Sequence, residues 1–139
     1  MKKTVLLFIA FISFTACKEK VKPEDVSKIN GYWEIESVNF PDGNEKNYKI
    51  SETIDYFEIK NDSGFRKKVM PQFNGKYLVN DKSEKIKIVR EDDKIYLNYS
   101  TEYSTWKEEV LEVTDDKLIL KNEAEIEYQY KKPTPFTLK

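Results

Sequence analysis

Apolar and polar positions alternate along most of this chain in short runs, with polar turn residues about every 8–14 positions. Such alternation is typical of half-buried β-strands. Tight connections between successive runs make neighbouring strands antiparallel. Because an open meander of this kind would leave two unpaired edges, the pattern favours closure into a barrel. The predicted fold class is therefore all-β, with about eight antiparallel strands in up-and-down order.

The predicted strands begin shortly after Gly31, and helical periodicity is absent apart from a short turn near 24–29. Polar clusters at 61–64, 81–83 and 91–93 are predicted turns. The longest connection, 41–52, follows the first strand and is the expected lid or mobile loop. The alternating runs are 33–36, 53–60, 65–69, 75–79, 85–90, 94–99, 106–113, 118–120 and 126–130.

The first apolar run differs from the others because it lacks polar alternation. Lys2 and Lys3 precede residues 4–14, which are almost free of polar side chains. A basic start followed by an apolar run of this length is typical of a secretory signal peptide. It is too short for a membrane span, which needs roughly 20 apolar residues. Residues 1–16 are therefore predicted to be a signal peptide.

Cys17 is the only cysteine and directly follows the small residues Thr15 and Ala16. The segment 14–17 resembles the lipobox of bacterial lipoproteins, in which the cysteine is acylated with chains such as palmitate and becomes the first mature residue. Here Phe14 replaces the usual leucine. The resemblance implies a lipid-anchored protein of the cell envelope, with the outer membrane as its expected location. A free thiol, an intermolecular disulfide and a nucleophile are the alternatives for this cysteine.

The segment after Cys17 is charged and contains Pro23, so residues 17–28 are predicted to be a flexible tether behind the lipidated cysteine. Lysine and acid directly after the cysteine are similar to surface-export signals of some Bacteroidetes-type lipoproteins. The periplasmic and surface faces of the membrane both stay open. The barrel is predicted over 29–132, and 133–139 form a proline-containing C-terminal tail.

Charge and composition exclude several classes of function. The chain has 24 basic and 25 acidic residues, interspersed along its length, and no histidine. Interspersed charge indicates a solvated surface rather than a nucleic-acid footprint. Without histidine, Ser-His-Asp and Cys-His catalysis are excluded, and zinc lacks its usual ligands. We expect no cofactor, no metal ion and no nucleic-acid partner.

Neighbouring acids occur at 91–93, at Glu108 and Glu109, and at 115–116. Glycosidases use two carboxylates, so these acids raise a carbohydrate-active enzyme as an alternative. The first and last groups lie in predicted turns, however, and Glu108 and Glu109 point to opposite faces of a strand. We therefore expect no enzyme. The alternative would need two carboxylates roughly 5–10 Å apart in a cleft.

A family resemblance begins at the first predicted strand. Gly31 and Trp33 form a Gly-x-Trp motif similar to that of lipocalins, which are eight-stranded up-and-down barrels whose tryptophan plugs the closed end. The turn 114–116, Thr-Asp-Asp, resembles the lipocalin Thr-Asp-x turn. Residues 29–132 therefore resemble the lipocalin-like domains of Bacteroidetes lipoproteins.

The resemblance also implies a set of residues that close the barrel. These are Gly31, Trp33 and a basic residue after the last strand, which is Lys131 or its neighbour Lys132. Lysine here replaces the usual arginine.

An eight-stranded barrel is just wide enough to be filled by side chains or to hold one small ligand. Inward tyrosines each need a hydroxyl partner, which a cavity supplies more readily than a dry core. The leading hypothesis is a non-catalytic envelope lipoprotein that binds a small hydrophobic or amphipathic molecule. The alternative is a solid-core interaction module that contacts another envelope protein or an extracellular polymer through a strand face or the 41–52 loop.

Candidate ligand contacts are Trp33, Phe57, Tyr77, Tyr99, Tyr128 and Tyr130, from a predicted inner set that also includes Ile35, Ile59, Val79, Ile86, Ile88, Ile95, Leu97, Leu118, Leu120 and Ile126.

Overall fold

The computed structural model describes residues 20–49 and 53–133. The predicted signal peptide, Cys17 and residues 134–139 lie outside the described residues. Within the described part of the chain, no helix is long and apolar enough to cross a membrane.

A short 3-10 helix and nine strands make up the secondary structure of the described residues. The elements are η1 Pro23–Ile29, β1 Gly31–Asn39, β2 Glu45–Asn47, β3 Ile54–Lys60, β4 Ser63–Pro71, β5 Tyr77–Glu91, β6 Lys94–Ser100, β7 Thr105–Val113, β8 Lys117–Asn122 and β9 Glu127–Lys131.

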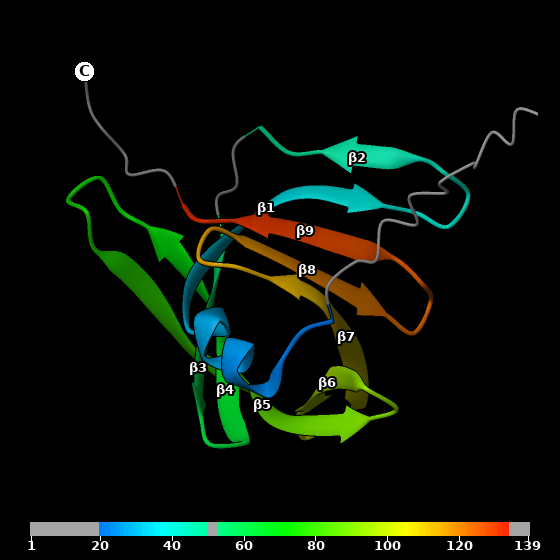
Figure 1. Ribbon diagram of the computed structural model, residues 1–139. Coiled ribbons are helices and arrows are strands. Elements are labelled where there is room, and N and C mark those ends of the chain that lie inside the picture. The colour runs from blue at the N-terminus through cyan, green and yellow to red at the C-terminus, as the bar shows by residue number, and fades with distance from the viewer. Residues whose placement is uncertain (1–19, 50–52, 134–139) are drawn as a thin grey trace, which may run out of the picture.

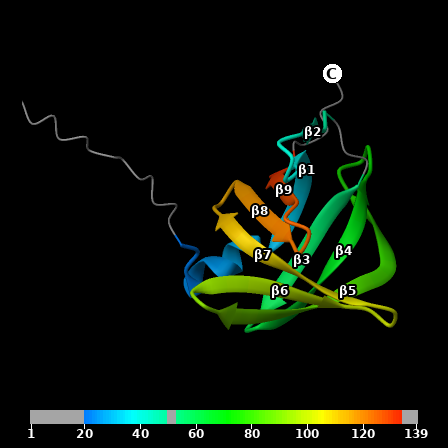
Figure 2. The same ribbon diagram turned by 90° about the vertical axis from the view of Figure 1, so that its right-hand side faces the viewer.

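The sheet closes on itself because β1 pairs with both β3 and β9 (Figures 1 and 2). Its residues 31–33 pair with β3, and its residues 34–39 pair with β9, both antiparallel. The strands β3 to β9 follow one another in sequence order around the wall. The predicted eight-stranded antiparallel barrel is confirmed, formed by β1 and β3 to β9.

The predicted loop 41–52 contains a strand that the sequence did not indicate. Residues 45–47 form β2, which pairs with the outer end of β1 at residues 37–39. A tight turn precedes it, in which Phe40 N–H donates to Asn44 O at 2.8 Å and Gly43 N–H donates to Phe40 O at 3.0 Å. At least this part of the connection is therefore held by the sheet.

The long strand β5 corrects another prediction. The polar cluster at 81–83 is not a turn, because β5 runs without a break from Tyr77 to Glu91. The pairing with β4 shifts there, from Lys67↔Ser83 to Val69↔Val79, so one residue of β4 opposes three of β5. The polar residues mark an irregularity within one strand, which bends it without ending it.

Beyond this irregularity, β4 and β5 continue as a hairpin that extends past the rest of the wall, at the upper left of Figure 1. Paired positions on it include Met70↔Leu78 and Pro71↔Tyr77. Four large apolar side chains of the hairpin are exposed: Met70, Phe73, Leu78 and Val79.

The helix η1 shows that folded structure begins before residue 29. Pro23 occupies its start, where a missing N–H costs nothing, and Asp25 accepts a hydrogen bond from Lys22 N–H at 3.1 Å. Val26 and Ile29 are buried against the barrel core. The part of the predicted flexible tether from Pro23 onward is thus part of the folded domain, because these two apolar side chains supply a packing face.

Candidate functional site

One end of the barrel is closed by η1 and Trp33, whose side chain is fully buried. The indole Nε1–H donates to Ile29 O at 2.8 Å, so the only polar atom of the plug is satisfied by the end of the helix. Asn30 then clamps the end of β3: its Nδ2 donates to Ile59 O at 3.1 Å, and its Oδ1 accepts from Ile59 N–H at 2.5 Å. The closed end is therefore held by both packing and hydrogen bonds.

A lysine covers the tryptophan from outside, and it is Lys132 rather than Lys131. Its Nζ lies 3.9 Å from the Trp33 ring centroid, within cation–π range. Gly31 lies beneath it with a φ of +115°, a backbone conformation that favours glycine, whereas a Cβ there would make only an ordinary contact of 3.5 Å with the Lys132 ammonium. Lys131 instead pairs with Glu34 and Lys117 in the sheet. One step along an extended chain exchanges the two faces of a strand, which is why neighbouring lysines were hard to tell apart from sequence.

The turn after β7 is built by its threonine. Thr114 Oγ1 donates to Asp116 Oδ1 at 2.9 Å and accepts from Lys117 N–H at 3.1 Å. Thr114 N–H donates to Lys117 O at 2.8 Å, which closes the turn. Burial lowers the pKa of Lys132, and nearby Asp115 partly offsets this, so the turn stabilises the charge that covers the plug.

Around the plug, buried apolar side chains form one contiguous cluster. We call its aliphatic members, together with Trp33 and Phe57, the apolar layer; they come from η1 and from β1, β3, β5, β6, β7 and β8. Gly64 allows β4 to approach closely, because a Cβ there would lie 1.9 Å from Glu58 O. The layer consists of Val26, Ile29, Trp33, Phe57, Ile59, Ile86, Ile88, Ile95, Leu97, Val110, Val113, Leu118 and Leu120.

Farther from the plug, the interior becomes charged. The inward positions of β4 run from Gly64 to Arg66 and then Lys68, and their partners in register are Ile59, Phe57 and Asp55 on β3. We call the five ionisable side chains of this region the charged layer: Asp55, Arg66, Lys68, Glu84 and Glu108.

Arg66 is the centre of the charged layer. Its Nε donates to Glu84 Oε2 at 3.0 Å, and its Nη2 contacts the same oxygen. Its Nη1 lies 3.4 Å from Glu108 Oε1, and the guanidinium carbon lies 4.3 Å from the Tyr99 ring centroid. One planar cation thus serves two carboxylates and an aromatic face, a task for which arginine is better suited than lysine.

A second ion pair lies beside the first. Lys68 Nζ is 2.7 Å from Asp55 Oδ1; the Asp55 side chain is 5% exposed, whereas that of Lys68 is 58% exposed. The buried carboxylate therefore depends on a cation that reaches it from the solvent side. Removing such a partner from a buried charge is far more costly than forming the pair is favourable.

Burial shifts the ionisation of this region. It raises the pKa of Glu108, and Arg66 only partly reverses the effect. Burial also raises the pKa values of Tyr99 and Tyr130 well above their ordinary range, with further increases from Glu108 next to Tyr99 and from Asp55 next to Tyr130. For Arg66, burial lowers the pKa, but the surrounding oxygens outweigh it, and the net pKa is raised. Both tyrosines are therefore protonated, and Arg66 is charged.

A cavity of about 240 Å³ opens over the Asp55–Lys68 pair. We call it the mouth cup. Asn122 Nδ2 donates to Tyr128 Oη at 3.3 Å, which fixes one tyrosine of its wall. The residues that line the mouth cup are Trp33, Ile35, Val38, Tyr48, Thr53, Asp55, Lys68, Tyr128 and Tyr130.

Comparison with known proteins assigns this barrel to a family. The sequence pattern of the lipocalin-like domain family matches residues 29–120, which is more than half of the chain. The chain belongs to the lipocalin-like family. No curated protein matches the sequence.

Solved structures similar to this lipocalin-like barrel are distant in sequence. A lipocalin-like protein from Bacteroides uniformis has a TM-score of 0.49 and 11% identity, over 76% of this chain and 99% of that chain. An uncharacterised protein from Bacteroides eggerthii has a TM-score of 0.47 and 16% identity, over 75% and 98%. Apocrustacyanin C2 has a TM-score of 0.47 and 8% identity, over 84% and 67%.

The predicted ligand contacts are distributed over three places in the lipocalin-like barrel. Trp33, Tyr128 and Tyr130 line the mouth cup. Phe57 and Tyr99 are buried beneath it, Phe57 in the apolar layer and Tyr99 against Arg66 and the stacked ring of Trp106, 5.4 Å away.

Tyr77 is a correction to the predicted inner wall. It stacks on Tyr32, with ring centroids 4.2 Å apart, and Tyr32 lies on the outer face because its neighbour Trp33 points inward. Val79 is also exposed. The irregularity in β5 interrupts the alternation on which both inward positions were predicted.

Asp55, Arg66 and Glu108 are interior residues that sequence reasoning missed. Their strands alternate, and Val110, which shares the face of Glu108, is buried. Extending that alternation would have placed Glu108 inside. The prediction that Glu108 and Glu109 do not converge agrees with the structure, since Glu109 faces Lys94 and Lys121 at 3.9 and 3.8 Å.

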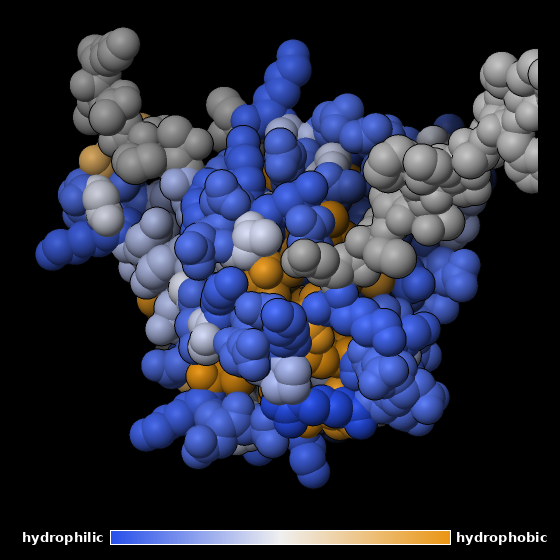
Figure 3. All heavy atoms as spheres, in the orientation of Figure 1, coloured by the Kyte–Doolittle hydropathy of each residue, from blue (hydrophilic) through white to orange (hydrophobic). Residues whose placement is uncertain are grey.

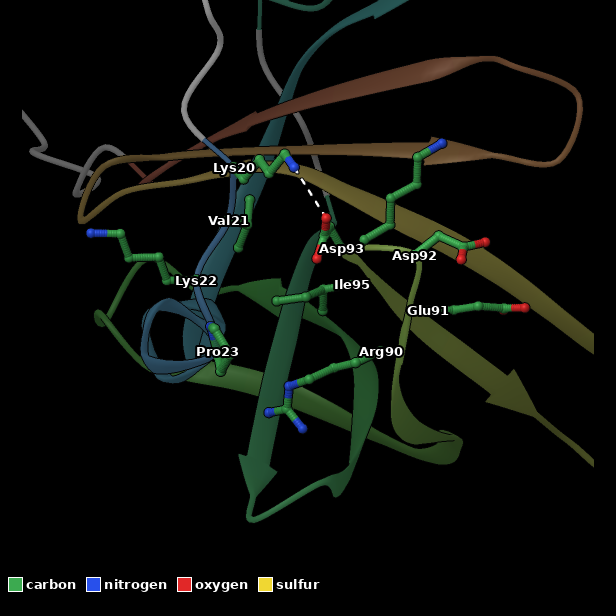
Figure 4. A pocket seen from close by; sticks show the side chains of 10 residues that line it. Lys20, Val21, Lys22, Pro23, Arg90, Glu91, Asp92, Asp93 and Ile95 are labelled. Carbon is green, nitrogen blue, oxygen red and sulfur yellow. Dashed lines mark hydrogen bonds and ion pairs between the residues drawn. The ribbon is translucent and has the colours of Figure 1, made fainter.

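A second hollow, of about 570 Å³, lies outside the closed end (Figure 4). This hollow lies between residues 20–23 and the turn that joins β5 to β6, and Ile95 is among the residues that line it. Lys20 Nζ lies 3.2 Å from Asp93 Oδ2, but both side chains are largely exposed, so this pair contributes little. Charges of both signs line the hollow, and it lacks the buried polar group that the mouth cup has.

The outer surface of the barrel is mainly hydrophilic on the face that Figure 3 shows. The face in Figure 3 is covered mainly by hydrophilic side chains, with hydrophobic atoms visible in a band near its centre.

Proposed function

We propose that this protein is a non-catalytic, membrane-anchored envelope lipoprotein whose lipocalin-like barrel binds a small amphipathic molecule in the mouth cup. The observation that carries the proposal is the cup itself. Aromatic side chains form its wall, and the buried carboxylate of Asp55 with its exposed partner Lys68 forms its base, so it offers an apolar and a polar contact to one ligand.

The apolar layer limits the size of that ligand. Leu97, Leu118 and Leu120 are fully buried and belong to one contiguous packed cluster of apolar side chains. A ligand therefore occupies only the open half of the barrel, in about 240 Å³. This volume favours a compact molecule over a long acyl chain.

The binding test is native mass spectrometry of the full chain extracted from its own membranes. We expect an excess mass that is lost on denaturation. Val38→Phe would fill the cup and should remove the excess mass, because Val38 lines it. Val79→Phe adds the same bulk at an exposed position and should retain it. Equal masses for native and denatured protein in all three chains would argue against a carrier.

The anchoring part rests on the resemblance of residues 14–17 to a lipobox, with Cys17 as the acylated residue. Two acyl chains hold a soluble domain firmly at a membrane, since each buried methylene contributes about 0.8 kcal/mol. Cys17→Ala should release the protein from the membrane fraction and abolish labelling by a clickable fatty acid. Labelling that persists in this variant would refute the anchor. We place the protein at the outer membrane on the same resemblance.

One observation favours the alternative of an interaction module. The hairpin of β4 and β5 exposes the large apolar side chains of Met70, Phe73, Leu78 and Val79. The other surface considered for this role, the 41–52 loop, has no large apolar side chain over residues 42–47. Clustered exposed apolar side chains often mark a contact surface. A photo-crosslinker at position 78 should then capture one recurrent partner in cells. In a second experiment, Leu78→Lys with the crosslinker at a neighbouring position should abolish the crosslink to this partner and leave the mass of the bound ligand unchanged.

A further inference from the structure

Asp55 is a buried carboxylate, and its Oδ1 atom lacks a well-aligned hydrogen-bond donor among the described residues. It lines the mouth cup, and its cationic partner is the exposed side chain of Lys68. The two atoms are 2.7 Å apart, yet within the described chain no donor makes a well-aligned hydrogen bond to Asp55 Oδ1. Burying a carboxylate is costly unless N–H donors satisfy it. The cup therefore presents an acceptor that a better-placed cation can use.

The balance of charge in the charged layer selects the sign of the ligand. The layer holds three carboxylates and two cations, and Arg66 is already shared by Glu84 and Glu108. Asp55 interacts with Arg66 and the Tyr130 hydroxyl, but its direct ion pair is with Lys68. A ligand anion in the cup would meet this excess of negative charge at short range, whereas a ligand cation would compensate it.

The walls of the cup suit a cation with an apolar body. Trp33, Tyr48, Tyr128 and Tyr130 contribute aromatic rings, whose faces attract cations when water is excluded. The same rings bury an apolar group efficiently. Burial raises the pKa values of Tyr128 and Tyr130, so their hydroxyls stay neutral and accept hydrogen bonds.

We propose that the mouth cup recognises a small primary amine with an apolar body, whose ammonium takes the place of the Lys68 ammonium on Asp55. Lys68 occupies the site when the cup has no ligand and moves into solvent when the amine enters. A long, flexible and mostly exposed lysine can make this exchange with little change elsewhere. The inference rests on the proposed function, because it names the ligand class of the same cup.

The test compares three probes with one phenyl body: 2-phenylethylamine, 2-phenylethanol and 3-phenylpropionate. Their affinities are measured by titration calorimetry with the full chain in neutral phosphatidylcholine nanodiscs, with empty nanodiscs as the blank. We expect the amine to bind at least about tenfold more tightly than either of the others, because only it can compensate Asp55.

Two variants should change the affinity for the amine in opposite directions. Asp55→Asn keeps the shape and removes the charge, and should weaken binding at least about tenfold. Lys68→Met removes the resident ammonium and should strengthen it. Lys67→Met is the matched control, since Lys67 Nζ lies 5.2 Å from the ring centroid of Phe65, outside the cup, and it should leave the affinity unchanged.

Three results would overturn the inference. Tightest binding of 3-phenylpropionate would make Lys68 the recognition group and the cup an anion site. Weaker amine binding in Lys68→Met would show that lysine helps rather than competes. If no probe binds, the native mass separates the two claims: a retained molecule leaves the proposed function standing with another ligand class, and no retained molecule removes both. The comparison of probes on the unaltered chain needs no variant to fold.

Discussion

The two halves of the barrel interior are built on different principles. In the closed half, the apolar layer and the Trp33 plug fill the space, and their polar atoms are few and satisfied. In the open half, the charged layer replaces apolar packing by ion pairs around Arg66 and Asp55. Both halves share the same strands, so the difference arises entirely from which residue types occupy the inward positions.

This difference determines which substitutions destabilise each half. A packed apolar layer tolerates neither added nor missing volume, but it is insensitive to pH. A charged layer depends on the balance of its partners, since a buried charge without its counterion is strongly destabilising. Substitutions that change volume in the apolar layer and substitutions that remove a charge from the charged layer therefore test whether the interior divides into these two parts.

The largest effect is expected for Arg66→Met. It leaves Glu84 and Glu108 without their cation and should lower the free energy of unfolding by about 3–5 kcal/mol. Arg90→Met is the matched control, because the exposed pair of Arg90 with Asp62 contributes only about 0–1 kcal/mol. Urea unfolding measures both. Similar losses for the two arginines would remove the distinction between the halves.

A nearly equal loss is expected for Gly64→Ala in the closed half. The new Cβ would lie 1.9 Å from Glu58 O, a backbone atom that cannot move without displacing β3, so we expect about 3 kcal/mol or more. Gly75→Ala adds a methyl where nothing lies within 4 Å, and costs only the strain of its φ of 79°, about 1–2 kcal/mol. Thermal unfolding of both variants checks the order. A mild effect of Gly64→Ala would mean that the strands are less closely packed there.

A smaller effect, visible in its pH dependence, is expected for Glu108→Gln. Because the pKa of Glu108 is raised in the folded state, the unfolded chain loses this proton first, and native stability falls as pH rises above about 4.5. Glutamine cannot ionise, so the variant should gain stability relative to the natural chain across that range. Unfolding free energies from about pH 4 to about pH 8 test this.

The closed half supplies the reference for that pH series. Leu118→Ala should cost about 2–5 kcal/mol at every pH, because it only leaves a cavity in the apolar layer. A parallel pH profile for Glu108→Gln and Leu118→Ala would contradict the assignment of Glu108 as a buried acid.

The smallest effect is expected at the plug. Lys132→Met removes the cation over Trp33 and should cost about 0.5–1 kcal/mol. Lys131→Met should stay within about 0.5 kcal/mol, as is usual for substitutions away from special features. Chemical denaturation of the Lys131→Met and Lys132→Met variants measures the loss of unfolding free energy for each. A larger loss for Lys131→Met would mean that Lys131, and not Lys132, is the lysine that stabilises the plug.

The closed half was largely predictable from sequence. The alternation around Trp33, the Gly-x-Trp motif and the Thr114 turn all depend on local patterns, and the structure contains each of them. The open half was less so. Inward charge on alternating strands looks the same in sequence as outward charge, so Arg66 gave no signal until its strand was placed in register. Glu108 is placed inside only when the alternation is extended from Val110 through a charged residue.

Polar residues misled in a second way. The cluster at 81–83 has the composition of a turn, yet pairing with β4 on one side and β6 on the other keeps β5 extended up to and beyond it. Sheet neighbours, which a local pattern does not contain, override turn propensity here. Conversely, Val26 and Ile29 follow a charged stretch that alone predicts an unfolded tether.

The division of β1 between β3 and β9 has a consequence for how the protein is made. Its residue Glu34 pairs with Lys131, so the barrel closes through contacts between the two ends of the chain. Contacts so distant in sequence form slowly, since a long loop must be ordered before they are gained. An emerging chain therefore has unpaired strand edges until β9 is available. The proposed export in an unfolded form would suit such a topology, because the final closing step could then take place in the destination compartment.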